Sequence, residues 1–196
     1  MEKNKLKRRP YWYIKRLLDI IFSIILIILF LPLLIIASLL VIFNLGFPIH
    51  NQYRIREGYN KKPFLMLKLR TKKMDSDHLP RRKRYTNLSY IVDKLRLNEL
   101  PQLFNVLVGQ MSFVGPRPFI VGEKLPEGKI SEKRYMVRPG LTNLALVYGG
   151  ATLTHKQKLE YDIKYYDNFG FKQDFIIVMK VIAQLFLNVR EVKVVQ

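Results

Sequence analysis

The chain has 196 residues, a net charge of +19 and no cysteine. The lack of cysteine excludes a disulfide framework and a thiolate metal site, and three scattered histidines argue against a histidine-based zinc site. The positive charge suits one of three partners: nucleic acid, an anionic membrane surface or a phosphorylated substrate. No helix-turn-helix, RNP or zinc-finger pattern accompanies the charge, so nucleic acid is not expected as a partner.

Residues Ile20–Phe43 form an apolar run without a charged residue. A straight helix of this length is about 36 Å long and could cross a bilayer core of about 30 Å. Pro32 lies near its middle and should kink or break the helix. Basic residues flank both ends, and basic flanks prefer the cytoplasm. These features favour a re-entrant hairpin that enters and leaves by one face, with a spanning helix as the alternative.

Two short strands are expected next, at Gln52–Arg56 and Pro63–Leu69. Lys68 and Arg70 alternate with leucines, so both should point to one face of the second strand. Two cations on one face could clamp a phosphate group. A solvated edge strand guarded by its charges is the other interpretation.

A helix is expected to begin near Asn98, because asparagine is a good N-cap and Pro101 fits a first turn. Gly109 is well placed to end this helix. The helix start favours the Glu99 carboxylate and could also hold an anionic ligand with its free N–H groups. Capping alone would also explain both Asn98 and Glu99.

Two rigid turns each present one arginine. MSFVGPRPF holds Arg117 between two prolines, and VRPGL places Arg138 before Pro139. A rigid backbone that presents one arginine suits bidentate contact with phosphate. Further along, Lys156–Asn168 is expected to be helical, and Phe171–Leu187 to be an amphipathic helix that lies on the membrane or packs in the core.

Together these segments resemble the bacterial sugar transferases, the monotopic polyprenyl-phosphate phosphoglycosyltransferases. The resemblance covers nearly the whole chain and rests on five stretches. They are KRLLDIIFSIILIILFLPLLII, the QYR…KKPF segment, LKLRTKKM, LNELPQLFNVLVGQMSFVGPRP and VRPGLTNLALVYGG.

The resemblance implies transfer of a sugar phosphate from a UDP-sugar to undecaprenyl phosphate, with release of UMP, as the first membrane step of glycan assembly. It also implies an aspartyl-phosphosugar intermediate and Mg²⁺ near an Asp-Glu pair. The site residues that it implies are Asn98 and Glu99 as catalytic residues, Glu99 as metal ligand, and Arg54, Lys68, Arg70, Arg117, Arg138 and Pro139 as substrate-binding residues.

The expected fold is α/β, mainly helical with short strands. A small cytosolic domain would sit on the inner membrane by a re-entrant hairpin and interfacial amphipathic helices, in contact with anionic lipids. The expected segments are a basic leader (1–12), the hairpin broken at Pro32 (13–47), the catalytic domain (48–190) and a tail (191–196).

The chain departs from the family where the chemistry should occur. The family's nucleophilic aspartate corresponds to Asn98, and an amide is a poor nucleophile. Asp93 stands where the family usually has arginine. On a continuous helix it would lie about 140° around from Asn98, which argues against it as a substitute.

Three hypotheses follow from these departures. The chain is an enzyme with a shifted nucleophile such as Glu99, an inactive scaffold at the membrane, or a protein that binds lipid-linked or nucleotide sugars. Neither the sugar nor the glycan pathway can be read from the sequence, and a homodimer is compatible with it but not indicated by it.

Overall fold

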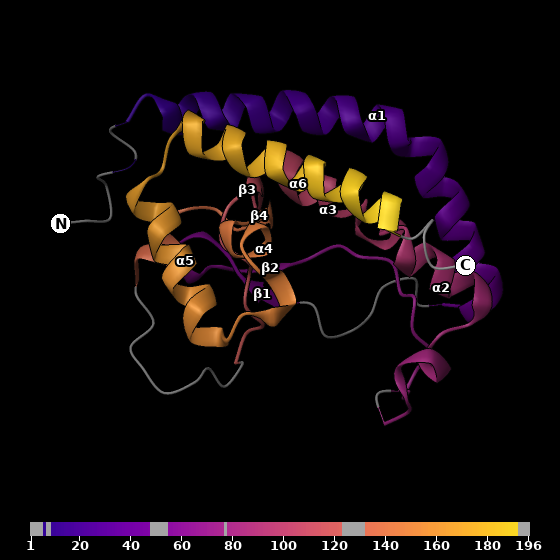
Figure 1. Ribbon diagram of the computed structural model, residues 1–196. Helices are drawn as coiled ribbons and strands as arrows, with labels where there is room; N and C mark the ends of the chain where they lie inside the picture. Colours follow the sequence, from indigo (N-terminus) through magenta and orange to yellow (C-terminus); the bar gives the residue numbers. More distant parts are fainter. Residues whose placement is uncertain (1–5, 7–8, 48–54, 77, 123–131, 192–196) are drawn as a thin grey trace.

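The computed structural model describes residues 6, 9–47, 55–76, 78–122 and 132–191. The described chain is mainly helical, as expected (Figure 1). Its α-helices are α1 (Tyr11–Leu45), α2 (Asn87–Lys94), α3 (Gln102–Leu107), α4 (Leu144–Val147), α5 (His155–Asp167) and α6 (Phe171–Glu191). Its 3₁₀ turns are η3 (Tyr59–Lys61), η4 (Arg81–Arg84), η5 (Leu97–Glu99), η6 (Glu132–Met136) and η7 (Gly150–Thr152).

Helix α1 is long and apolar enough to cross a membrane, and it continues through Pro32 without interruption. Figure 1 shows that α1 bends along its length. A bend has a cause here, because proline removes one backbone hydrogen bond and crowds the preceding turn. The helix ends at Gly46, which has a φ of +67° and donates its N–H to the carbonyl of Ile42 at 2.8 Å.

The strands form two small sheets. Strands β1 (Ile55–Glu57) and β2 (Pro63–Leu65) pair antiparallel, and β3 (Ser112–Val114) and β4 (Gly140–Thr142) pair in parallel. The expected second strand is therefore too long, because β2 ends at Leu65, before Lys68 and Arg70. The first expected strand falls mostly outside the described residues.

Strands β3 and β4 approach each other closely where two glycines face one another. A Cβ atom added to Gly140 would lie 2.1 Å from the backbone nitrogen of Gly115. No real side chain tolerates such a contact, so both positions require glycine. This close approach holds the turn of Arg117 next to the turn of Arg138.

The two predicted C-terminal helices are present. Helix α5 begins at a capping box in which Thr154 and Gln157 satisfy each other's backbone N–H groups. Helix α6 packs in the core with one face and leaves another apolar face exposed. Ile177 is fully buried in the core, while an exposed apolar face is formed by Phe171, Phe175, Ile176, Met179 and Ile182.

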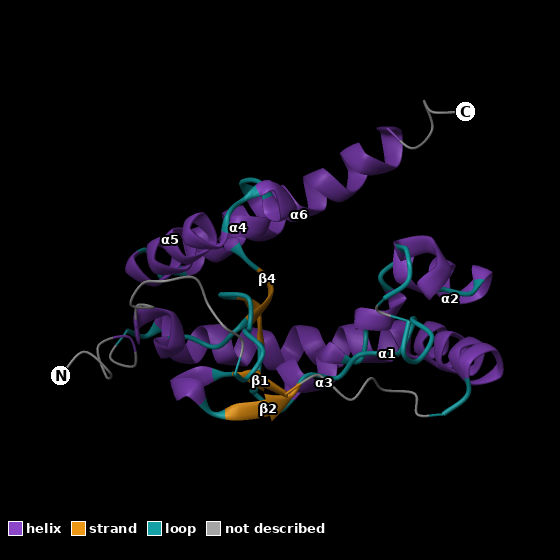
Figure 2. Ribbon diagram, turned by 90° about the horizontal axis from the view of Figure 1, so that it is seen from below, coloured by secondary structure: helices purple, strands orange, loops and turns teal. Residues whose placement is uncertain are grey.

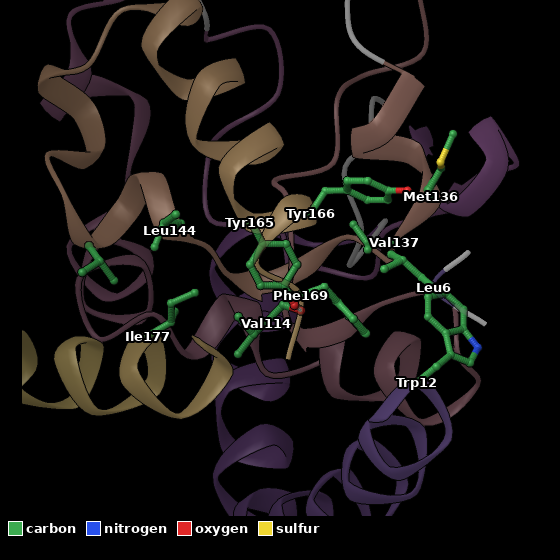
Figure 3. Close-up of a cluster of buried hydrophobic side chains, with 11 residues drawn as sticks. Leu6, Trp12, Val114, Met136, Val137, Leu144, Tyr165, Tyr166, Phe169 and Ile177 are labelled. Atoms are coloured by element: carbon green, nitrogen blue, oxygen red, sulfur yellow. Dashed lines mark hydrogen bonds between the residues drawn. The ribbon is translucent and has the colours of Figure 1, made fainter. Parts of the chain in front are cut away.

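The largest core lies between the start of α1 and helices α4, α5 and α6 (Figure 3). Trp12 of α1 and Tyr165 of α5 belong to this core. A second, smaller core joins the other end of α1 to α2, where Ala37 and Val41 pack with Val92. Both ends of α1 are thus packed against the rest of the chain, and α2 lies beside the C-terminal part of α1 in both ribbon views (Figures 1 and 2).

Candidate active site

The chain reverses between α2 and α3, and this reversal builds the candidate site. Thr86 starts α2 with a capping box, and the helix ends at Lys94. Arg96 then adopts a left-handed conformation with a φ of +56°. The backbone turns back, so that Asn98 lies within the 3₁₀ turn η5. The expectation that Asn98 caps a helix is wrong, because α3 begins later, with Pro101 at its N-cap position.

The reversal brings Asp93 and Asn98 into contact. The Asn98 side-chain amide donates a hydrogen bond to the Asp93 carboxylate at 2.7 Å. Thr71 donates its hydroxyl to the same carboxylate oxygen at 2.9 Å. The helical argument that separated Asp93 from Asn98 is wrong here, because α2 and η5 are not one continuous helix. The site therefore holds a carboxylate next to the amide that stands at the family's aspartate position.

Glu99 forms the second acidic group of the site, and it is bound by cations. Lys68 donates to one of its carboxylate oxygens at 2.9 Å, and Arg96 lies 3.7 Å from the other. The Glu99 side chain is 37 % exposed, so it remains open to solvent. Two of the residues predicted for the site, Lys68 and Glu99, thus contact each other.

The site lies next to the C-terminal end of α1. Val92 precedes Asp93 and packs against Ala37 and Val41 of α1. Arg70 is buried and donates to the carbonyl groups of Leu45 and Gly46, where α1 ends. Arg70 and Lys68 thus contact different groups, and neither residue lies in β2, so the prediction that both face one side of a strand is wrong.

Arg117 and Pro139 line a small pocket to which Glu99 does not contribute. The same pocket is lined by Glu57, Gly58, Pro116, Pro118, Arg134, Tyr135 and Val137. Arg117 is exposed and its backbone carbonyl accepts from Arg134 at 2.7 Å. Burial, together with the hydrogen bond to Glu57, raises the pKa of Tyr135 to about 12. Tyr135 therefore stays neutral at physiological pH and acts here as a hydrogen-bond donor.

Arg138 is tied into the scaffold. Its Nε donates to the carbonyl of Gly109 at 3.1 Å, and its guanidinium group lies 5.1 Å from the centre of the Trp12 ring. Burial lowers the pKa of Arg138, and the nearby charge of Arg16 lowers it further. Arg138 therefore closes the turn after α3. Arg54, which was also predicted to bind substrate, lies outside the described residues.

The side chains of the candidate site are compatible with a magnesium ion that is coordinated partly by the protein and partly by the phosphates of a substrate. No group of three histidine, aspartate or glutamate side chains comes together among the described residues. Mg²⁺ does not require such a cage, because it is usually held by one or two carboxylates, several waters and substrate phosphates. Glu99 could supply one carboxylate of this kind, because its side chain is accessible to solvent.

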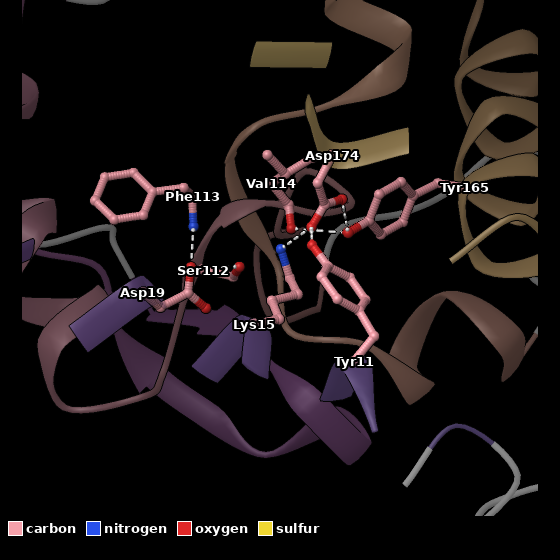
Figure 4. A network of polar contacts seen from close by, with 8 residues as sticks. All are labelled: Tyr11, Lys15, Asp19, Ser112, Phe113, Val114, Tyr165 and Asp174. Carbon is pink, nitrogen blue, oxygen red and sulfur yellow. Dashed lines mark hydrogen bonds and ion pairs between the residues drawn. The ribbon is translucent and has the colours of Figure 1, made fainter. Parts of the chain in front are cut away.

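Sequence reasoning missed a buried polar network that fixes α1 to the domain (Figure 4). Asp174 of α6 accepts from Lys15 at 2.5 Å and from Tyr11 at 2.6 Å, and Tyr165 donates to its other oxygen at 2.8 Å. Asp19 accepts from the backbone N–H of Phe113 at 3.2 Å. The available signal was the presence of ionisable residues at the edge of an apolar run, where charge is costly unless paired.

Comparison with known proteins identifies the family. The family model described as bacterial sugar transferase matches residues 10–188. This chain belongs to the bacterial sugar transferase family. The uncharacterised sugar transferase EpsL of Bacillus subtilis (strain 168) is 33 % identical over 179 residues, which cover 89 % of this chain and 88 % of that protein.

The chain is also similar to family members whose names state the reaction that they catalyse. The UDP-glucose:undecaprenyl-phosphate glucose-1-phosphate transferase of Caulobacter vibrioides is 37 % identical, over 87 % of this chain and 69 % of that protein. The UDP-N-acetylgalactosamine-undecaprenyl-phosphate N-acetylgalactosaminephosphotransferase of Aeromonas hydrophila is 34 % identical, over 89 % of this chain and 44 % of that protein.

Proposed function

We propose that this protein transfers a sugar phosphate from a UDP-sugar to undecaprenyl phosphate and releases UMP, as the first membrane step of glycan assembly. The family match over residues 10–188 carries this proposal. The position of the site supports it. Asp93, Asn98 and Glu99 lie beside the end of an apolar helix, where the phosphate of a lipid substrate could reach them.

The side chains of the site suit a reaction between two phosphorylated substrates. Lys68 and Arg96 place positive charge around Glu99, and such charge offsets the negative charge of a diphosphate as its bond breaks. Glu99 would hold Mg²⁺, which acts as a Lewis acid towards phosphate oxygens when bound. Asn98 would orient the neighbouring carboxylate. Arg54, Arg70, Arg117, Arg138 and Pro139 complete the proposed substrate-binding set, of which Arg117 is exposed for direct contact.

We propose that α1 is re-entrant and that the domain lies on the cytoplasmic face of the inner membrane. Trp12 at one end of α1 and Val41 near the other both pack against the rest of the chain. A helix that crossed the bilayer would carry one of these ends to the opposite side. Between these ends, the exposed side chains of α1 are large and apolar, as required for contact with lipid.

Helix α6 would add a second contact with the membrane. Its exposed face carries Phe171, Phe175 and Met179, and Lys172 and Lys180 lie on the same helix. Apolar side chains enter the boundary of the bilayer, while lysines attract anionic lipid headgroups. The partners proposed are thus a UDP-sugar, undecaprenyl phosphate and anionic lipids.

The test is release of UMP by the purified full chain in lipid nanodiscs. The assay contains undecaprenyl phosphate, Mg²⁺ and, in turn, UDP-glucose, UDP-galactose or UDP-N-acetylgalactosamine. Glu99→Ala should lower the rate by about 100–1,000-fold, because it removes the carboxylate that would hold Mg²⁺ against the phosphates. Glu132→Ala is the matched control, since Glu132 also pairs with a lysine, at 2.6 Å, on the exposed surface. Its rate should not change.

The same assay separates the enzyme from a scaffold. Release of UMP that needs Mg²⁺ and Glu99 supports the transferase. An absence of release with every sugar, combined with cellular glycan synthesis that survives Glu99→Ala, would replace it by the scaffold hypothesis.

A further inference from the structure

The candidate site presents two carboxylates in different electrostatic surroundings. Glu99 is contacted by two cations, Lys68 at 2.9 Å and Arg96 at 3.7 Å. No ion pair to Asp93 is formed within the described part of the chain, and Asp93 is half-buried. A carboxylate bound by two cations is a weaker nucleophile than one that is not, because the cations withdraw electron density from its oxygens.

Asp93 is held in place by neutral donors. Thr71 donates from the segment after β2, and Asn98 donates from η5. Both bonds reach the same oxygen, Oδ1, so they orient the carboxylate from one side. Two hydrogen bonds from neutral groups fix the orientation of the carboxylate, and neither donor neutralises its negative charge.

Asn98 is suited to this positioning role. Asn98 is only 2 % exposed, and it lies within the 3₁₀ turn η5. The Oδ1 atom of Asn98 has no hydrogen-bond partner among the described residues. The orientation of the side chain is therefore set by the hydrogen bond that its Nδ2 donates to Asp93. The reversed orientation of this amide would place two oxygens against each other, which the carboxylate's charge excludes.

We propose that Asp93 is the nucleophile of this protein and that Asn98 positions it. The proposal rests on the transferase function proposed above. An Asp93 oxygen forms a bond to the sugar-bound phosphorus of the UDP-sugar, and the bond from that phosphorus to the bridging oxygen breaks, so UMP leaves with the electron pair. An oxygen of undecaprenyl phosphate then attacks the same phosphorus, and the Asp93 carboxylate is released unchanged.

The contact between the two side chains allows a swap as a test. Asp93→Asn removes the carboxylate but keeps an oxygen that can accept from Thr71. Asn98→Asp alone would place two carboxylates at hydrogen-bond distance, where one must take up a proton. The double variant, Asp93→Asn with Asn98→Asp, restores one carboxylate and one amide with the hydrogen bond reversed. It should therefore fold as the original pair does.

The experiment traps the covalent adduct. The full chain in nanodiscs is incubated with the UDP-sugar that supports UMP release, without undecaprenyl phosphate, and the adduct is mapped by peptide mass spectrometry. We expect a sugar phosphate on Asp93 that hydroxylamine removes, as for an acyl phosphate. Asp93→Asn should lose the adduct and lower UMP release by at least about 100-fold, and the double variant should regain an adduct, now at position 98.

Asp167→Asn is the matched control. Asp167 forms an ion pair with Lys133 at 2.8 Å on the surface, so its loss should leave the adduct and the rate unchanged. An adduct on Glu99, UMP release without any adduct, or full activity of Asp93→Asn would overturn the assignment and leave the transferase function intact. No UMP release from any UDP-sugar would instead overturn the proposed function and this inference with it.

Discussion

Replacing Asp174 by asparagine should strongly destabilise the protein, because it breaks the buried ion pair that fixes α1 to α6. The side chains of Lys15 and Asp174 are only 10 % and 9 % exposed, and their charged atoms lie 2.5 Å apart. Removing one partner of a buried pair leaves the other charge unpaired in a medium that solvates it poorly. Such changes cost about 3–5 kcal/mol of the free energy of unfolding.

The measurement is thermal unfolding in detergent, followed by circular dichroism. For a chain of this size, a loss of about 3–5 kcal/mol lowers Tm by about 6–20 °C. Asp167→Asn again serves as control, because its ion pair is 33 % and 48 % exposed and should contribute only about 0–1 kcal/mol. Adding Lys15→Met to Asp174→Asn should recover part of the loss, since no unpaired charge then remains.

The reasoning is refuted if Asp174→Asn lowers Tm no more than Asp167→Asn does. Burial would then not determine the strength of these pairs. A double variant that is less stable than Asp174→Asn alone would likewise show that the unpaired lysine is not the source of the cost.

Two further predictions concern pH and topology. Burial raises the pKa of Asp162 to about 6 despite its ion pair with Arg134. Its contribution to stability is therefore fully present below about pH 4 and is lost as the pH rises through about 6, a change of about 3 kcal/mol. Urea unfolding between pH 4 and 7 should show this loss in the original chain and not in Asp162→Asn. Cysteines introduced at exposed Tyr13 and Phe47 should both react with a membrane-impermeant reagent from the cytoplasmic side only; opposite-side labelling would establish a spanning helix.

The sequence alone determined the elements whose signals are local. The apolar run predicted a long helical segment with a kink or break at Pro32, and α1 forms there as one continuous helix, because the length and apolarity of the run are local properties. Helix α5 is specified by local signals, namely the capping box of Thr154 and Gln157 and the apolar residues that follow it at helical spacing. Family membership could also be inferred from sequence, since LNELPQLFNVLVGQMSFVGPRP is a long contiguous motif.

Only the tertiary structure decided how the site is assembled. The contact of Asp93 with Asn98 depends on the left-handed conformation of Arg96, which no periodic pattern predicts for an arginine. The different partners of Lys68 and Arg70 depend on where β2 ends and on the carbonyl groups at the end of α1, which accept from Arg70. The contact of Asp93 with Asn98 spans only five residues, but it needs a backbone conformation that the local pattern does not specify. The bonds of Arg70 to Leu45 and Gly46 join segments 25 and 24 residues apart, and the energies of such contacts are absent from any local window of residues.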